Sequence, residues 1–390
     1  MNDTISLAQD ELIAEAANRT GGLADFGAEP FLGQLALLLD ALEQEARLNP
    51  LGRMIARERV LGHLVNRLLF IDDRKKYPAI AQEKIIKPVF IIGMPRTGST
   101  ILHDIFAQDP ANRVPMTWEC MFPSPPPERA TFLTDPRIAR CEAMFPDIDA
   151  LIPGFKAMHP MGAMLSQECV TMMADTLCSP LFHNQFRIPS FEDWVDTKAD
   201  WSHVYTFHEQ QLQHMQWRCP GERWVLKTGA HMWGLEHLLA KYPDARIVFT
   251  QRDPVKSLTS YASLTALVRS MGSSEIDRLE IARDWSPRIL RAVTHALDVR
   301  EAKDYPDAIM YDMYFHDFVD DQFAQVEQIY GALGLEMSGA AADAMRRFIN
   351  DNPQGKHGLH TYTAEEYGID PAQVRRDFVR YIERFDLQPV

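Results

Sequence analysis

Residues 89–100 read VFIIGMPRTGST, and this stretch decides the fold. Its first four residues form a short, continuously apolar run, which is typical of a strand covered on both faces in a parallel sheet. Gly93 and Gly98 follow, and a glycine-rich turn between a buried strand and a helix points backbone N–H groups at one spot. We therefore predict a phosphate-binding P-loop. The loop adds three hydroxyl donors: Thr97, Ser99 and Thr100.

This loop lacks two features of a nucleotide triphosphatase: the lysine after the second glycine and a metal-holding aspartate at the end of a downstream strand. A triphosphatase has a lysine after the second glycine, but here that position is Ser99 and the basic residue comes early, at Arg96. The apolar run 246–250 continues into Gln251 and Arg252, so it does not end in a metal-holding aspartate. The sequence predicts an anion cradle that suits a single 5′-phosphate carrying a less charged group, without a metal ion.

Two further strand–helix units follow downstream. Residues 223–228 (RWVLKT) precede a helical pattern over 231–243, and residues 245–254 (ARIVFTQRDP) precede another over 254–268. Strands that alternate with helices at this spacing indicate a parallel sheet. We predict an α/β P-loop three-layer fold with a central parallel sheet.

Helical segments surround this core. Apolar residues at three- and four-residue spacing predict helices within 8–75, and hence a helical N-terminal extension over 1–85. The segment of about 125–220 reads as a helical cap inserted into the α/β core, which spans 86–390. We expect a single domain over 1–390.

Composition narrows the range of partners. The 390 residues carry a formal net charge of −14, so a nucleic acid is not an expected partner. The polar, acidic N-terminus does not resemble a signal peptide, and no apolar run approaches the ~18 residues that span a bilayer. The five dispersed cysteines indicate reduced thiols and a cytoplasmic location. An apolar stripe over 31–42 favours core packing, and peripheral membrane contact stays open.

A second anion site is predicted at Arg252. This residue ends a strand, where ligands of open parallel sheets bind. Ser260 lies two helical turns along if a helix begins near Pro254, so the arginine fork and the hydroxyl can hold a second phosphate. The alternative is a structural ion pair of Arg252 with Asp253 or a nearby acid.

The two motifs PRTGST (95–100) and RDPVKSLTS (252–260) together resemble the PAPS-dependent sulfotransferases, in particular a bacterial branch with an N-terminal helical extension. PAPS is adenosine with a 3′-phosphate and a 5′-phosphosulfate. The resemblance extends from about residue 10 to the C-terminus. Four further stretches carry it: TGGLADFG (20–27), WECMFPSPPP (118–127), WVLKTGAH (224–231) and GKHGLHTYTAEEYGI (355–369).

The resemblance implies how PAPS is held. The loop binds the 5′-phosphosulfate with Arg96 near the sulfuryl group, and Arg252 with Ser260 binds the 3′-phosphate. A sulfuryl group carries less charge than a phosphoryl group, so no metal is expected. The segment over 356–358 approximates a basic segment over the 3′-phosphate, and a solvated loop is the alternative. The implied binding residues are Arg96, Thr97, Gly98, Ser99, Thr100, Arg252, Ser260, Lys356, His357 and Gly358.

The acceptor hydroxyl needs a base, and two residues are candidates. His231 is preferred because a histidine titrates near neutral pH, and the family has a Lys–Thr–His arrangement that two extra residues interrupt here. Lys227 would stabilise the bridging oxygen. Glu119 is the second candidate for the base, since some sulfotransferases use a glutamate at about this place. Glu168 is read instead as a solvated or ion-paired acid.

The acceptor is expected to be a hydrophobic small-molecule or lipid alcohol. Five methionines crowd part of the insertion, and such clusters adapt to irregular apolar partners, although flexible core packing is the simpler interpretation. They are Met158, Met161, Met164, Met172 and Met173. Two other functions stay open: a P-loop kinase using ATP and magnesium, and a non-catalytic nucleotide- or lipid-binding protein.

Overall fold

The structure is a computed structural model that describes residues 5–27, 31–145, 161–302, 304–305, 307–353 and 362–388. A five-stranded parallel sheet forms the centre, with strand order β2-β3-β1-β4-β5. The predicted parallel sheet is thereby confirmed. The strands are β1 (Val89–Gly93), β2 (Asn112–Arg113), β3 (Arg223–Lys227), β4 (Arg246–Gln251) and β5 (Ile309–Tyr314).

Strand β1 lies in the middle of the sheet and is buried on both faces. Val89 pairs in parallel register with Val225 of β3 and with Arg246 of β4. Successive side chains of a strand point to opposite faces, so Val89 packs into one apolar core and Phe90 into the other. A strand that is buried on both faces needs an apolar residue at each position, and the apolar run of β1 predicted this burial.

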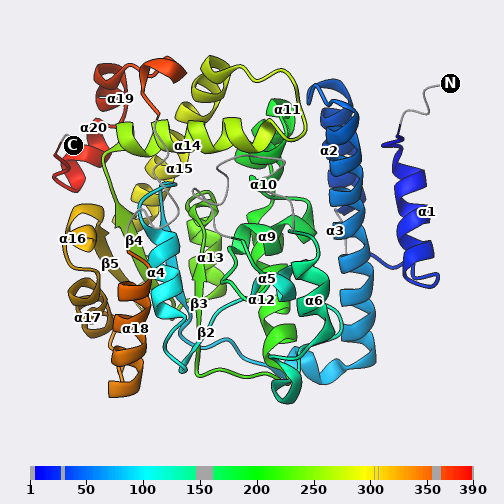
Figure 1. Ribbon diagram of the computed structural model, residues 1–390, viewed down its shortest axis with the longest axis horizontal. Coiled ribbons are helices and arrows are strands. Elements are labelled where there is room, and N and C mark those ends of the chain that lie inside the picture. Colours follow the sequence, from blue (N-terminus) through cyan, green and yellow to red (C-terminus); the bar gives the residue numbers. More distant parts are fainter. Residues whose placement is uncertain are drawn as a thin grey trace.

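Helices cover both faces of the sheet, which makes three layers (Figure 1). One face packs against helices near β1 and β5: α4 (Ser99–Phe106), α16 (Phe315–Asp320), α17 (Gln322–Ala332) and α18 (Gly339–Asp351). The other face packs against α12 (Trp201–Gln216), α13 (Leu235–Lys241), α14 (Pro254–Arg269), α15 (Arg278–Ala302), α19 (Pro371–Asp377) and α20 (Val379–Arg384).

The predicted N-terminal helices are present as α1 (Gln9–Arg19), α2 (Phe31–Gln44) and α3 (Pro50–Lys76). They stand side by side at the right of Figure 1. The apolar stripe of α2 is buried, so core packing was the correct interpretation. Its members are Phe31, Leu35, Leu38, Leu39 and Leu42.

The predicted helical cap lies between β2 and β3 and contacts the N-terminal helices. Its helices are α5 (Thr117–Met121), α6 (Pro136–Glu142), α9 (Cys169–Met173), α10 (Leu181–Gln185), α11 (Pro189–Thr197) and α12. Short 3₁₀ helices lie between these elements: η1 (Pro78–Gln82), η2 (Arg129–Thr131), η3 (Ala174–Thr176), η4 (Gly229–Met232) and η5 (Glu365–Tyr367).

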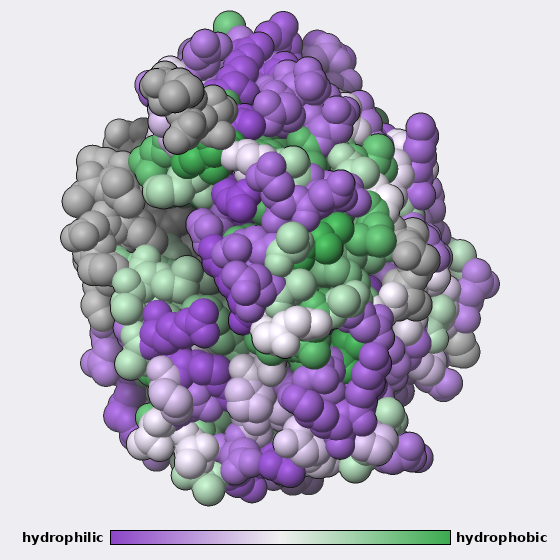
Figure 2. All heavy atoms as spheres, turned by 90° about the vertical axis from the view of Figure 1, so that its right-hand side faces the viewer, coloured by the Kyte–Doolittle hydropathy of each residue, from purple (hydrophilic) through white to green (hydrophobic). Residues whose placement is uncertain are grey.

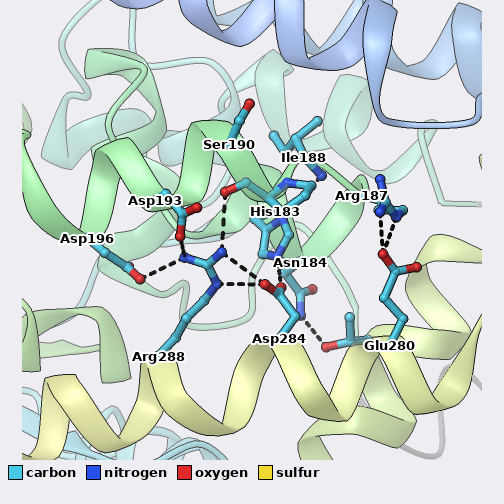
Figure 3. A network of polar contacts seen from close by, with 12 residues as sticks. His183, Asn184, Arg187, Ile188, Ser190, Asp193, Asp196, Glu280, Asp284 and Arg288 are labelled. Atoms are coloured by element: carbon cyan, nitrogen blue, oxygen red, sulfur yellow. Dashed lines mark hydrogen bonds and ion pairs between the residues drawn. The ribbon is translucent and has the colours of Figure 1, made fainter.

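A buried ionic network fastens the cap to α15 (Figure 3). The Arg288 guanidinium lies 2.8 Å from a carboxylate oxygen of Asp196 on α11 and 2.9 Å from one of Asp284, one helical turn away. Asp284 in turn pairs with His183 of α10. Charges at this depth are stable only when they are paired, so the network fixes α10 and α11 against the core.

The face formed by the N-terminal helices carries green apolar patches bordered by purple polar residues (Figure 2). Exposed apolar side chains of α2 and α3 are Leu32, Leu37, Leu51 and Met54. Within the described ranges, no helix is both long and apolar enough to span a membrane. All five cysteines are free, as expected for reduced thiols, and all are buried.

Candidate active site

The P-loop turns sharply between β1 and α4, and glycines make the turn. Gly93 and Gly98 have φ angles of 143° and 85°, which side chains rarely adopt. A Cβ on Gly93 would also lie 2.4 Å from the Thr250 hydroxyl. Arg96 adopts φ 65° as well, and a non-glycine residue there is uncommon. The loop thereby wraps its backbone around the N-terminus of α4, as an anion cradle requires.

Hydroxyl groups fix the inner side of the loop. The buried Thr97 hydroxyl donates to the carbonyl of Met94 at 2.8 Å and lies 2.5 Å from the Thr250 hydroxyl. Thr250 donates to the carbonyl of Ile92 at 3.0 Å. The side chain of Thr97 is therefore committed to shaping the loop, and Ser99 and Thr100, half-buried in the first turn of α4, are the hydroxyls with access to a ligand.

Hydrogen bonds of Arg96 connect the P-loop with the second predicted anion site, that of Arg252 and Ser260. Helix α14 begins at Pro254 as predicted, and Asp253 caps it by accepting from the Val255 N–H. Ser260 is therefore two turns along α14, where its hydroxyl accepts a hydrogen bond from Arg96 Nε at 3.1 Å. Arg252 donates from Nη1 to the carbonyl of Arg96.

Arg252 does not form the structural ion pair that was its alternative interpretation. Asp253 pairs instead with Arg375, at 3.1 Å. The Arg252 guanidinium stacks over the Phe315 ring, 4.0 Å from its centre, and burial lowers its pKa. In the described ranges, no carboxylate forms an ion pair with Arg252. Its charge is therefore available to an anion.

Lys227 ends β3 directly beside the P-loop. Its Nζ is buried and donates to the Thr100 hydroxyl at 3.0 Å. The same Nζ forms an ion pair with Glu168, which precedes α9. A cation, a hydroxyl and a carboxylate therefore meet at the N-terminus of α4.

A small cavity that opens to solvent lies at this meeting point. Asp104 lies one turn after Thr100 on α4 and accepts a hydrogen bond from the Ser166 hydroxyl. Burial raises the pKa of Asp104. Because Ser166 is two residues before Glu168, this contact holds the loop that carries Glu168 against α4. The cavity is lined by Thr100, Asp104, Thr117, Met161, Gly162, Leu165, Ser166, Gln167, Glu168 and Lys227.

His231, the preferred base of the sequence analysis, is not part of this group. Its ring is fully buried, and its Nδ1 lies 2.8 Å from the Tyr205 hydroxyl. The rings of Phe90 and His208 contact it edge-on. Burial, followed by the nearby His208, holds the pKa of His231 well below its usual value. This environment is that of a core histidine.

Glu119 is not part of the group either. It lies in the short helix α5. Both of its carboxylate oxygens bind the Arg113 guanidinium, and one accepts the Met116 N–H at 3.0 Å. This buried pair closes the N-terminus of α5 and leaves the carboxylate committed to the structure.

The remaining predicted residues divide between core, cavity and undescribed segments. Met172 and Met173 are buried in the core, whereas Met161 lines the cavity and Met164 is exposed. Met158, Lys356, His357 and Gly358 lie outside the described residues.

Glu168 is ion-paired, which is one of the two environments expected from the sequence, and the pair places it at the cavity. The sequence did not predict Asp104 and Ser166 beside it. All three depend on the cap folding back onto α4, so residues far apart in sequence become neighbours. The one available signal was an acid and a hydroxyl in the motif SQE (166–168) beside apolar residues, which alone does not distinguish a site from a surface loop.

Comparisons with known proteins agree with this geometry. A sequence model described as the sulfotransferase family matches residues 88–339. Omega-hydroxy-beta-dihydromenaquinone-9 sulfotransferase Stf3, found in Mycobacterium bovis and Mycobacterium tuberculosis, is 24% identical over 300 residues, which cover 72% of this chain and 71% of that protein.

Two crystal structures share the fold over nearly the whole chain. Sulfotransferase STF1 from Mycobacterium tuberculosis superposes with a TM-score of 0.85 and 31% identity, covering 97% of this chain and 100% of that one. Sulfotransferase STF9 from Mycobacterium avium superposes with a TM-score of 0.88 and 26% identity, covering 99% of this chain and 98% of that one. The chain therefore belongs to the sulfotransferase family.

Proposed function

We propose that this protein transfers the sulfuryl group of PAPS to the hydroxyl of an apolar small-molecule or lipid acceptor. The observation that carries the proposal is the position of Lys227, whose Nζ bridges the Thr100 hydroxyl of the P-loop helix and the Glu168 carboxylate at a cavity.

The described residues fit PAPS as the donor. The P-loop around Gly98 suits the 5′-phosphosulfate, because its backbone wraps the N-terminus of α4. Arg252 and Ser260 suit the 3′-phosphate, because the guanidinium has no carboxylate partner in the described ranges and both residues contact Arg96. PAPS, when bound, supplies an activated sulfuryl group, and transfer leaves PAP.

Glu168 replaces His231 and Glu119 as the base in this proposal. The carboxylate would accept the proton of the acceptor hydroxyl as its oxygen forms the new bond to sulfur. Lys227 would stabilise the negative charge on the oxygen that bridges phosphorus and sulfur when the old bond breaks. Arg96, whose side chain contacts Ser260, would add positive charge near the sulfuryl group. Lys227 would act from the end of β3 and Glu168 from a loop held against α4, so the two groups are positioned before the acceptor binds.

The cavity suits an acceptor hydroxyl on an uncharged, apolar body. Met161 and Leu165 line it beside the polar group. Asp104 and Glu168 there outnumber the single cation Lys227, which disfavours an acidic glycan. The Stf3 relatives carry the name of a menaquinone-derived acceptor, which agrees with a hydrophobic alcohol. The family membership makes a P-loop kinase or a non-catalytic binding protein less favoured.

Calorimetric titration with PAP and with ATP–magnesium tests the donor. We expect PAP to bind tightly in the presence of EDTA and ATP–magnesium to bind far more weakly. A clear preference for ATP, or a requirement for magnesium in sulfuryl transfer, would contradict the proposal. Tight PAP binding without turnover of any hydroxylated acceptor would favour the non-catalytic alternative.

A further inference from the structure

Asp104 places a second carboxylate in the proposed acceptor cavity, and the protein uses only one of its two oxygens. Oδ1 accepts the hydrogen bond from the Ser166 hydroxyl. Among the described residues, no group donates to Oδ2, and Oδ2 is not sealed from solvent. Lys227, the cation of the cavity, bonds to Thr100 and Glu168 instead. Oδ2 of Asp104 is therefore a hydrogen-bond acceptor that is available to a ligand.

Gln167 supplies a hydrogen-bond donor to the same cavity. Its side-chain Oε1 accepts the Glu168 N–H at 2.8 Å, which fixes the amide so that its NH₂ group is the end left over. Nε2 has no acceptor within the described ranges, and it is not sealed from solvent either. The cavity thus presents one available acceptor, Asp104 Oδ2, and one available donor, Gln167 Nε2. A hydroxyl group both donates and accepts, so it matches this pair.

The carboxylates of Asp104 and Glu168 lie close enough to contact one small group. On α4, Asp104 comes one turn after Thr100, and side chains at this spacing are about 5–6 Å apart. The Thr100 hydroxyl marks the position of Glu168, because both bond to Lys227 Nζ. On the opposite wall, Glu168 comes two residues after Ser166, the partner of Asp104, and two residues of chain span at most about 7 Å.

Hydroxyls on two adjacent carbons match this separation. One hydroxyl would give its proton to Glu168 as its oxygen bonds to sulfur, and the other would donate to Asp104 and keep its proton. Two short hydrogen bonds of about 2.5–2.7 Å, together with the gap between neighbouring hydroxyl oxygens, cover the distance between the carboxylates.

The rest of the acceptor would lie outside the polar part of the cavity. The cavity is small, so it suits the hydroxylated end of the acceptor and not an entire lipid. Met161 and Leu165 line it, and Leu165 is partly exposed at the surface. Met161 also packs against Val268 of α14, in a cluster that includes Leu264. An alkyl chain would therefore continue from the cavity along apolar side chains.

We propose that Asp104 accepts a hydrogen bond from a second hydroxyl of the acceptor, so that the acceptor is a vicinal diol on an alkyl chain. This inference rests on the proposed function. A hydroxyl satisfies both Asp104 and Gln167, whereas an ammonium group, which only donates, would leave the Gln167 NH₂ group without an acceptor. A carboxylate would be repelled by Asp104.

The test compares octane-1,2-diol with octan-1-ol, which has the same chain and lacks the second hydroxyl. Binding of each alcohol to the PAP-loaded protein is measured by calorimetry, and its sulfation is measured separately with PAPS. A hydrogen bond to a charged group corresponds to roughly a 10- to 100-fold difference in affinity. We expect the wild type to prefer the diol by this factor.

Two variants separate recognition of the diol from support of the loop. Asp104→Asn keeps the oxygen that Ser166 contacts and replaces Oδ2 by an NH₂ group, so the preference for the diol should fall to within a few-fold. Ser166→Ala is the matched control, because it removes the contact to the loop and leaves the carboxylate in place. It should keep the preference for the diol, even if sulfation of both alcohols slows. Thermal midpoints of both variants check that they fold.

Four outcomes overturn the proposal. They are equal affinities of the wild type for both alcohols, failure of both alcohols to bind, an undiminished preference in Asp104→Asn, and loss of the preference in Ser166→Ala as well, which would mean that Asp104 only holds the loop. Tighter binding of 2-aminooctan-1-ol than of the diol would also overturn it and indicate an ammonium group. A preference that depends on Asp104, in a protein that sulfates neither alcohol, would contradict the proposed transfer reaction alone.

Discussion

Arg96 Nε donates a hydrogen bond to the Ser260 hydroxyl across 3.1 Å, and this contact couples the P-loop to α14. The Ser257 hydroxyl, one turn earlier on α14, donates to the Pro95 carbonyl. The two contacts hold the loop and the helix as one unit. A ligand with one phosphate group at the P-loop and another at α14 would therefore bind to a preformed site.

Replacement of Arg252 should separate the two phosphate sites. We expect Arg252→Ala to weaken PAP binding roughly 10- to 100-fold, because a charge-assisted contact to the 3′-phosphate is lost. Adenosine 5′-phosphosulfate, which lacks the 3′-phosphate, should lose far less. Arg375→Ala, which removes the surface partner of Asp253, is the control. Equal losses for both nucleotides would mean that Arg252 only supports the loop.

Replacement of Glu168 should remove the base and leave the donor site intact. We expect Glu168→Gln to lower kcat by about 10²- to 10⁴-fold while PAP affinity changes by less than about tenfold. Single-turnover transfer to a hydrophobic alcohol measures the rate. Glu209→Gln breaks a different glutamate–lysine pair, that with Lys241, and should leave the rate unchanged.

His231 offers the decisive comparison for that role. We expect His231→Phe to keep transfer within a few-fold of the wild type, since the ring is enclosed by aromatic side chains. A large loss of transfer in His231→Phe, with a full rate in Glu168→Gln, would return the role to the histidine.

Local sequence patterns were sufficient to predict the fold. The apolar run over 89–92 is typical of a strand covered on both faces, and the glycines that follow are typical of a sharp turn. The alternation of strands and helices along the chain then predicts a parallel sheet. The relative positions of Arg252 and Ser260 were also predictable, because both lie within one strand–helix unit and the helix sets their spacing.

Contacts between distant segments were not predictable. Lys227 and Glu168 are far apart in sequence, and their pairing depends on how the cap packs on α4. The pKa argument for His231 assumed access to water. Burial removes that access, and no local pattern in WVLKTGAH reports it.

Glu119 should prove to be a stability residue. Glu119→Gln leaves the buried Arg113 guanidinium without its carboxylate, and we expect a loss of about 3–5 kcal/mol in the free energy of unfolding. The double replacement Arg113→Met with Glu119→Leu should recover most of this loss, since it leaves no unpaired charge. Urea unfolding measures both. Transfer lost in Glu119→Gln at a temperature where it stays folded would instead indicate a catalytic role.

Buried histidines should make the protein sensitive to acid. Burial lowers the pKa of His208 to about 3, whereas an unfolded histidine titrates near 6.5. Below about pH 6.5 the unfolded chain therefore binds a proton that the folded protein does not. The free energy of unfolding then falls with decreasing pH, by up to ~1.4 kcal/mol per pH unit for each such histidine. His103, with a pKa lowered to about 4, and His214, lowered to about 3, add to the effect.

Replacing His208 alone measures how much this one histidine contributes to the pH dependence of the free energy of unfolding. In urea unfolding between about pH 7 and pH 4.5, the curve for His208→Phe should be shallower than the wild-type curve by up to ~1.4 kcal/mol per pH unit. Loss of the contact between His208 and the Tyr242 hydroxyl shifts the whole curve but leaves its slope unaffected. His316→Asn, at an exposed position, is the control for replacing a histidine outside the core. Parallel curves for the wild type and His208→Phe would show that His208 takes up its proton without unfolding, and hence that water reaches the aromatic enclosure around it.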